Sequence, residues 1–503
     1  MDILSNLGAG FALVADLHIL MIILLGTTIG IVIGVIPGLT ATMAVALAVP
    51  VTFSMETMPG LALLISIYVG GMTGGLISAM LLNIPGTPGN IATTFDGYPM
   101  AVRGEPGRAL GYGITASFLG GGFSYLCLLF LAPAIANIAV KLSYFGIFSI
   151  IMCAMVMIAD SSQGSMRKAL AAGCIGMLIG VVGPDPIDAS YRLTFDIFEI
   201  SAGFAEASVL IGLFAIPQII SDMRNVDYKC PDFKVNYRNI IPGVSELKAS
   251  AGNMLRSALI GTGIGIIPGV GSSSAAIVAY NQAKSMSRNP EKFGTGIRDG
   301  IIAPETANNA VSGGAMIPLL TLGIPGCPVA ALLLSGLIIK DLQPGPALFS
   351  NNPDVVYGFF LAFIIANFAM FGLMLLCIKP FAQVLKIPRY LLVPPILAFC
   401  TIGAYMSNNL MADVWVLLGF GIVGYFLEKF KYPLAPLVLG FILGPSAELQ
   451  LRRGLTYSNG DLTPLVTDPV SLIFLLLAAV ILLLPFWQQR RMRRREAENR
   501  ASC

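Results

Sequence analysis

Long apolar stretches alternate with short polar or glycine- and proline-containing segments along nearly the whole chain. Long apolar runs dominate and the weak alternation of a membrane barrel is absent, so we expect membrane-spanning helices. A helix needs roughly 20 residues to cross a bilayer, and the apolar content therefore predicts about twelve crossings. The apolar stretches lie near residues 11–35, 60–82, 109–138, 142–159, 168–182, 205–220, 254–280, 306–323, 327–339, 355–378, 390–406, 412–427, 433–445 and 470–487.

Composition narrows the class of protein further. Of the 503 residues, 56% are hydrophobic and 11% are charged, whereas a soluble domain carries roughly 25% charged residues. This excludes a soluble enzyme, a secreted disulfide scaffold and a disordered protein. Several apolar stretches are too short to span or are cut by Pro-Gly, which is typical of broken or re-entrant helices. We therefore expect an all-α polytopic membrane protein that contains such broken helices.

A central polar segment divides the chain into two parts of similar length. We expect a first half over residues 1–220, a polar linker over 221–252, a second half over 253–487 and a basic tail over 488–503. A basic cluster directly after a span marks the cytoplasmic side, so the C-terminus is predicted to be cytoplasmic. Contact with anionic lipid or nucleic acid is the alternative for this tail. The first apolar stretch lacks a basic n-region and a cleavage site, and we expect it to be a retained span.

The two halves repeat one another. The motif G-x-x-x-G-x-I-P-G begins at Gly30 and again 231 residues later at Gly261. The motif I-P-G-x-P begins at Ile84 and again 240 residues later at Ile324. Two ordered matches at nearly one offset predict an internal duplication. Whether the second copy has the opposite orientation in the membrane depends on whether an odd or even number of spans separates it from the first copy.

The repeated Pro-Gly pairs predict interruptions inside membrane helices. Proline removes a backbone donor, and glycine permits a positive φ and a close backbone approach. Backbone groups freed in this way are tolerated only where they line a cavity or are buried in protein. Paired interruptions in two halves point to a transporter site, where helix ends attract anions and freed carbonyls coordinate cations.

Neutral hydroxyl and amide side chains surround these interruptions. Carboxylates can bind to their N–H and O–H donors, and Na⁺ can bind to their oxygens. The alternative is that serine and threonine satisfy broken backbone while small residues allow close helix packing, as we expect for the glycines at 26, 30 and 34. Glu305 lies at the mouth of an apolar run, where intramembrane acids often couple ions. The candidate substrate- or ion-binding residues are Pro37, Gly38, Thr40, Thr42, Asn83, Pro85, Gly86, Thr87, Asn90, Pro268, Gly269, Gly271, Ser272, Ser273, Ser274, Glu305, Thr306, Asn308, Asn309, Pro325 and Gly326. A Na⁺ site is predicted near Asn83, Ser273 and Asn309.

Catalytic signatures are weak or absent. The chain has no Walker A lysine motif and a single histidine, so neither that route of ATP hydrolysis nor an H-E-x-x-H metal site is available. No catalytic residue, cofactor or nucleic-acid partner is predicted. A lipid-modifying membrane enzyme would need clustered intramembrane acids, histidines or cysteines. The sequence shows no such cluster, which argues against this class of enzyme. A passive channel also tolerates broken helices and stays open as an alternative, as does a transporter of another broken-helix family.

Four motifs together resemble the large membrane subunit of tripartite tricarboxylate transporters. They are G-V-I-P-G-L-T from Gly34, L-N-I-P-G-T-P-G from Leu82, G-I-I-P-G-V-G-S from Gly265 and P-E-T-A-N-N-A from Pro304. The similarity of length and motif order extends to about Pro485. The motifs are specific in combination and ordinary singly.

The resemblance implies properties that composition does not show. It implies a multi-pass protein of the bacterial inner membrane that works with a small membrane subunit and a periplasmic solute-binding protein. It implies secondary import of citrate or other carboxylates, with Na⁺ favoured over H⁺ as the coupling cation. An elevator-like architecture fits the duplicated, broken helices, and a homo-oligomer is a further expectation.

Overall fold

The computed structural model describes residues 3–161, 165–224, 240–385, 387, 391 and 393–483. In this part of the chain the structure is helical apart from turns, loops and one two-stranded sheet. The chain forms two compact units, one of Met1–Val140 and Phe204–Phe430 and the other of Lys141–Gly203 and Lys431–Cys503. The all-α membrane class expected from the sequence is confirmed. The predicted basic tail and the central part of the predicted linker, residues 225–239, lie outside the described residues.

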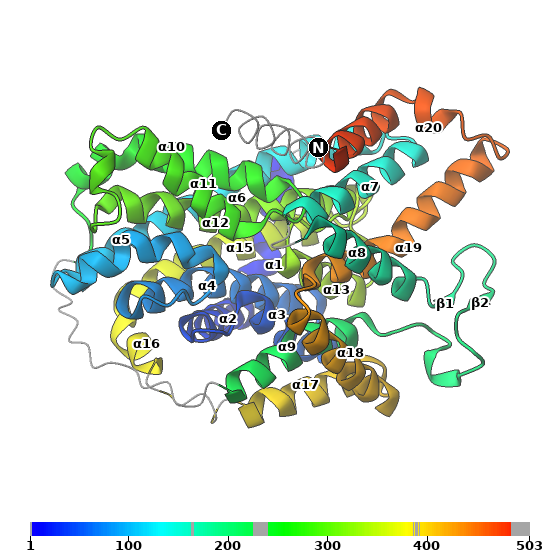
Figure 1. Cartoon of the computed structure of the whole chain (residues 1–503), viewed down its shortest axis with the longest axis horizontal. Helices are drawn as coiled ribbons and strands as arrows, with labels where there is room; N and C mark the ends of the chain where they lie inside the picture. Colours follow the sequence, from blue (N-terminus) through cyan, green and yellow to red (C-terminus); the bar gives the residue numbers. More distant parts are fainter. Residues whose placement is uncertain are drawn as a thin grey trace, which may run out of the picture. The chain divides into compact units, whose positions relative to one another are not determined.

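The first unit contains most of the helices (Figure 1). They are α1 (Ile3–Val14), α2 (Leu17–Val35), α3 (Ala41–Ala48), η1 (Pro50–Ser54), α4 (Thr57–Leu82), η2 (Pro88–Asn90), α5 (Ile91–Val102), α6 (Pro106–Ala139), α9 (Glu206–Arg224), α10 (Val244–Ile266), α11 (Gly271–Ser285), η4 (Pro290–Lys292), α12 (Arg298–Leu322), α13 (Pro328–Ile339), α14 (Leu348–Asn351), α15 (Pro353–Leu376), α16 (Ile378–Val384), α17 (Val393–Asn408) and α18 (Met411–Lys429).

The second unit is smaller. Its elements are α7 (Tyr144–Ser161), α8 (Met166–Gly180), β1 (Gly183–Pro184), β2 (Tyr191–Arg192), η3 (Phe198–Ile200), α19 (Leu434–Tyr457), α20 (Pro464–Thr467) and a last apolar helix, Pro469–Leu483. Helix α19 packs on both α7 and α8.

Six helices among the described residues are long and apolar enough to cross a membrane. They are α2, α4, α6, α15, α18 and α19, and six further apolar helices are shorter. The sequence predicts about twelve crossings, and that number stays a prediction. The shorter helices include the one beginning at Ala41, after the first interruption, and Pro328–Ile339, after the last.

Glycines let the long helices of the first unit pack with their backbones almost in contact. A methyl group on Gly30 or Gly34 of α2 would overlap the carbonyl oxygens of Ile67 or Gly71 on α4. This is the small-residue packing face that the four-residue glycine spacing indicates. Replacing these glycines with larger residues would force α2 away from α4.

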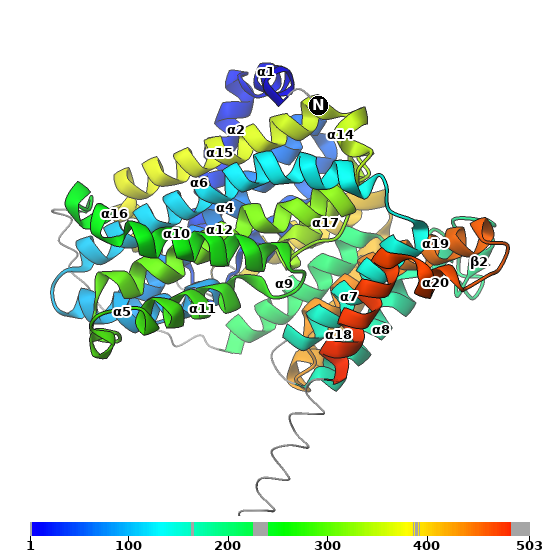
Figure 2. The same ribbon diagram turned by 90° about the horizontal axis from the view of Figure 1, so that it is seen from above.

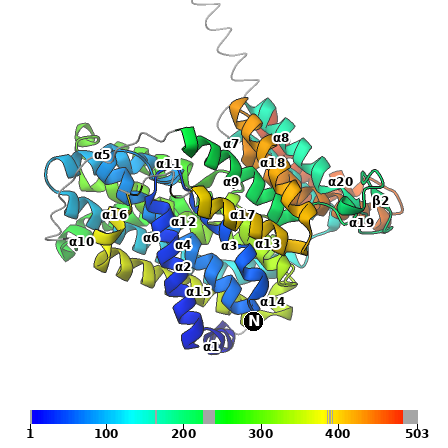
Figure 3. The same ribbon diagram turned by 90° about the horizontal axis from the view of Figure 1, so that it is seen from below.

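Helices from the first half of the sequence pack against helices from the second half. Helix α6 of the first half lies along α12 of the second, and α15 of the second half lies against α4 of the first (Figure 2). Seen from the opposite side, α9 packs against α18, which follows it by almost 190 residues (Figure 3). The first unit therefore joins both halves of the sequence in one body.

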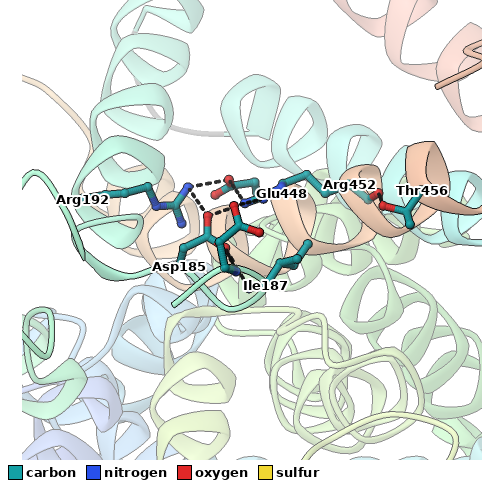
Figure 4. Close-up of polar contacts among 7 residues, drawn as sticks. Asp185, Ile187, Arg192, Glu448, Arg452 and Thr456 are labelled. Carbon is teal, nitrogen blue, oxygen red and sulfur yellow. Dashed lines mark hydrogen bonds and ion pairs between the residues drawn. The ribbon is translucent and has the colours of Figure 1, made fainter. Parts of the chain in front are cut away.

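A polar cluster fixes the hairpin of the second unit (Figure 4). In the hairpin, Gly183 pairs with Arg192 and Pro184 with Tyr191. The buried Asp185 carboxylate accepts the backbone N–H groups of Ile187 and Asp188 and forms ion pairs with Arg192 and Arg452. Glu448 pairs with the same two arginines, at 2.5 Å from Arg192 and 3.5 Å from Arg452.

The Asp185 cluster predicts a pH-dependent stability. Backbone N–H groups of Asp188 and Ile187, with Arg452, lower the pKa of Asp185 to about 2, from about 3.9 in an unfolded chain. Its carboxylate therefore stabilises the fold above about pH 4, and this contribution is lost as the pH falls toward 2. We expect Asp185→Asn to unfold a few degrees below the unmodified protein at pH 7. The two unfolding temperatures should converge between pH 4 and pH 2.

Thermal unfolding in detergent, followed by intrinsic fluorescence, measures this difference. Asp196→Asn is the matched control because Asp196 is exposed in the same segment and makes no described hydrogen bond or ion pair. A gap between Asp185→Asn and the unmodified protein that stays constant down to pH 2 would contradict the assignment.

Candidate functional site

The first interruption of each half has the same backbone geometry. Helix α2 ends at Val35 and α10 at Ile266, and the next residue in each case is extended, with φ of −77° and −81°. Gly38 and Gly269 then take positive φ values of 98° and 81°. The left-handed region favours glycine, so the Pro-Gly pair ends the helix and turns the chain in both places.

The second interruptions also match. Asn83 follows the last residue of α4 at φ 58°, and Gly323 follows the last residue of α12 at φ 69°. A methyl group on Gly86 would overlap the carbonyl oxygen of Gly34, and one on Gly326 would lie 2.6 Å from the carbonyl oxygen of Gly265. Glycine is thus required where each second interruption approaches the first interruption of its own half.

One interruption from each half meets helix α12. Gly89 is buried, and a methyl group there would overlap the Oδ1 atom of Asn308 and lie 2.8 Å from the Ser272 Oγ atom. The Nδ2 group of Asn308 donates to the carbonyl of Met72 at 3.2 Å. Its buried Oδ1 atom has no hydrogen-bond donor among the described residues. An amide oxygen that lies at a helix interruption and accepts no hydrogen bond can bind a cation or an ordered water.

A buried carboxylate lies beside this junction. Glu305 is fully buried in α12, two turns from its start. Asn90 Nδ2 donates to its Oε1 atom at 2.8 Å, Thr93 Oγ1 donates to the same atom at 2.5 Å, and Ser117 Oγ donates to Oε2 at 3.1 Å. All three donors are neutral, so no described basic side chain balances the charge of an ionised Glu305.

A second hydrogen-bonded group extends along the same helix. Thr73 Oγ1 donates to Asn309 Oδ1 at 2.8 Å, and Asn309 Nδ2 donates to the carbonyl of Glu305 at 3.2 Å. The Thr87 hydroxyl donates to Asn90 Oδ1 at 2.6 Å. The buried hydroxyl of Thr306 has no described partner. The site is thus lined by amides and hydroxyls from both halves around one carboxyl group.

The remaining candidates lie elsewhere in the interruptions. Thr40 caps α3 by accepting the N–H of Met43 at 3.2 Å. Asn83 is exposed and ends α4 in the left-handed conformation. No described hydrogen bond joins the side chains of Asn83, Ser273 and Asn309, the three residues of the predicted Na⁺ site. The other candidates that no described side-chain hydrogen bond joins to the Glu305 group are Pro37, Gly38, Thr42, Pro85, Gly86, Pro268, Gly269, Gly271, Ser272, Ser274, Thr306, Asn308, Pro325 and Gly326.

Sequence reasoning missed three residues of the site. Thr93 follows Asn90 by one helical turn, and this spacing could have placed it on the same face. Ser117 on α6 and Thr73 on α4 carry no local signal, because their partners lie 188 and 236 residues away.

Asp96 anchors a loop, and none of its described hydrogen bonds reaches the Glu305 group. Its buried carboxylate accepts the Tyr280 hydroxyl at 2.9 Å and the backbone N–H groups of Gly294, Gly296 and Ile297 at 2.7–3.0 Å. With these four donors it holds the segment between α11 and α12.

Comparison with known proteins gives one family and two relatives. The model of the tripartite tricarboxylate transporter TctA family matches residues 20–439. An uncharacterized 52.8 kDa protein in the TAR-I ttuC' 3' region of Agrobacterium vitis is 33% identical over 475 residues, 94% of each chain. An uncharacterized protein in the TAR-II ttuC' 3' region of the same organism is 41% identical over 215 residues, 43% of this chain and 89% of that protein. No solved structure gave a significant match.

Proposed function

This chain belongs to the tripartite tricarboxylate transporter TctA family, and from that premise we propose that it imports tricarboxylates or related carboxylates by cation symport, with Na⁺ favoured over H⁺. The family is one of transporter components, which work with a small membrane subunit and a periplasmic binding subunit. The chain is accordingly a membrane subunit of such a system. Citrate-like anions are the substrates that we propose.

The observation that carries the symport proposal is the Glu305 carboxyl group with neutral donors only. A di- or tricarboxylate that binds beside the Glu305 group adds negative charge next to an acid that no described cation balances. Two like charges in a poorly solvated site repel strongly. A cation that binds with the substrate removes this penalty, so binding of the two is coupled. The unpartnered Asn308 oxygen offers a ligand for Na⁺, while protonation of Glu305 is the corresponding route for H⁺.

We also propose that the two interruptions in each half are a duplicated transport element. The matching φ values and the matching Gly86–Gly34 and Gly326–Gly265 approaches support this. An elevator-like movement of this element is part of the proposal, and its support is that the first unit carries the whole candidate site. The bacterial inner membrane, a cytoplasmic C-terminus and a homo-oligomer belong to the same proposal.

Uptake into proteoliposomes tests the proposed function. The vesicles contain this chain with its small membrane subunit, the binding protein and radiolabelled citrate are outside, and pH is fixed. We expect uptake to require both an inward Na⁺ gradient and the binding protein, because the cation offsets the charge of the bound carboxylate.

The controls separate the alternatives. A proton gradient without Na⁺ tests H⁺ coupling, and succinate and tartrate replace citrate to test other carboxylates. Uptake that ignores both the gradients and the binding protein would favour a passive channel and contradict the proposal. Failure of every carboxylate under both gradients would also contradict it.

A further inference from the structure

A basic pocket opens at the end of the first unit where α6, α10 and α12 begin. Its volume is about 810 Å³. Six of its lining side chains are cationic, and three are acidic. The cations are Arg103, Arg108, Arg256, Arg288, Lys292 and Arg298, and the acids are Glu105, Glu246 and Asp299. We call this cavity the basic pocket.

The three acids already have partners. Glu246 lies 2.5 Å from Arg108 and accepts the Tyr112 hydroxyl at 2.7 Å. The Tyr112 hydroxyl, the backbone N–H of Gly243 and Arg108 lower the pKa of Glu246, so it is ionised at neutral pH. Arg108 also pairs with Glu105 at 3.1 Å.

Asp299 is the third acid, and it is likewise engaged. Arg298 lies 3.9 Å from its carboxylate, and Asn253 donates to it at 3.2 Å. The acids therefore pair with Arg108 and Arg298 and not with the other four cations, and six cations against three acids leave the lining with a net charge of +3.

None of those four cations has an acidic partner among the described residues. Arg103 donates to the carbonyl of Gly296. Arg256 donates to the carbonyl of Gly252 at 3.1 Å and to the sulfur of Met286 at 2.8 Å. No described hydrogen bond or ion pair engages the exposed Arg288 and Lys292 side chains. Like charges that share a cavity repel one another, and an anion in the cavity relieves this repulsion.

The segment between α11 and α12, which carries Arg288 and Lys292, is anchored by hydrogen bonds to Asp96 and Arg103. Buried Asp96 accepts three backbone N–H groups between Gly294 and Ile297, and Arg103 binds the carbonyl of Gly296. The rule that cytoplasmic segments of membrane proteins are rich in Lys and Arg explains basic residues in loops in general. It does not require them to surround one cavity or their loop to be anchored by a buried carboxylate.

We propose that the basic pocket binds a small anion carrying two or more negative charges, through its carboxylate or phosphate groups, with Arg256, Arg288 and Lys292 as ligands. The positive end of the α12 dipole adds to the attraction, because Arg298 and Asp299 at its first turn line the pocket. Glu305 lies seven residues further along α12, which is about 10 Å. The basic pocket is thus a second site, distinct from the Glu305 group.

Binding of radiolabelled pyrophosphate to the full chain in phosphatidylcholine nanodiscs tests this. The pocket variant is Arg288→Gln with Lys292→Gln, and we expect it to bind at least about tenfold more weakly, since each lost charge-assisted contact counts. The matched control is Lys429→Gln with Lys431→Gln, which removes the same charge from exposed positions outside the pocket. This control should bind like the unmodified protein.

A second arm separates a free anion from a lipid headgroup. Nanodiscs that contain cardiolipin repeat the measurement, and mass spectrometry measures the cardiolipin that co-purifies with each variant. Loss of pyrophosphate binding on adding cardiolipin, with less co-purified cardiolipin in the pocket variant, identifies a headgroup as occupant. Pyrophosphate binding that cardiolipin leaves unchanged identifies a free anion. The proposal is overturned if the unmodified protein binds neither probe, or if the pocket variant binds as the unmodified protein does.

Discussion

Replacing Glu305 with glutamine is expected to lower cation-driven carboxylate uptake by roughly 100-fold while the protein still folds and inserts. The substitution keeps the size of the side chain and an acceptor oxygen for Asn90 and Thr93, which donate to Oε1. It removes the negative charge that the coupling cation is proposed to neutralise, and a charge-assisted contact with that cation contributes about 1.5–3 kcal/mol, where 1.4 kcal/mol is tenfold. Initial uptake rates with and without the cation gradient measure the effect.

Ser117→Ala is the matched control for Glu305→Gln. It removes one of the three described donors to Glu305 and leaves the carboxyl group in place. We expect it to reduce uptake less than Glu305→Gln does, since the Asn90 and Thr93 donors to Oε1 remain. Normal gradient-dependent uptake by Glu305→Gln would show that the Glu305 carboxyl group takes no part in coupling the cation to transport.

Replacing Gly89 with alanine is expected to lower uptake by about tenfold or more. The added methyl group would overlap Asn308 Oδ1 and crowd the Ser272 hydroxyl, so it would fill the place where the two halves meet. Overpacking of a closely packed site costs about 1–3 kcal/mol, and here the cost falls on the atoms proposed to hold the ligand. Uptake rates and the size-exclusion profile of the purified variant are measured together.

Gly263→Ala is the control for the added methyl group. Gly263 lies on α10 near its interruption, and a methyl group there meets no atom within 4 Å. We expect nearly unchanged uptake. Equal losses of uptake in both variants would show that the effect does not depend on the position of the added methyl group. Unchanged uptake by Gly89→Ala would exclude the junction of Gly89, Ser272 and Asn308 as the site.

Local chemistry explains why the helix breaks could be read from the sequence. The pairs Pro37–Gly38 and Pro268–Gly269 remove a backbone donor and allow a positive φ, and these properties belong to the residues themselves. The structure accordingly ends α2 at Val35 and α10 at Ile266. For Asn83 the same local reasoning leaves two roles open, because an asparagine before I-P-G is also suited to end a helix in the left-handed conformation that it adopts here, and its part in binding stays a prediction.

The neighbours of Glu305 depend on packing and could not be read in the same way. A hydrogen bond between Glu305 and Ser117 joins residues 188 positions apart, and any buried hydroxyl of α6 would serve equally well as far as the sequence shows. Which hydroxyl faces the carboxyl group depends on the rotation and register of α6 against α12. Glycine contacts such as Gly120 against the Thr306 backbone set that register.

The sequence by itself determined the all-α membrane class, the places where the Pro-Gly pairs end helices and the family motifs that surround these breaks. All of these follow from the length and polarity of short segments. Only the tertiary structure decided that Asp96 anchors a loop, that Asn90 and Ser117 bind Glu305, and that six cations line one pocket. These contacts join segments far apart in the chain, and their free energy comes from burying groups whose partners are chosen when the helices pack.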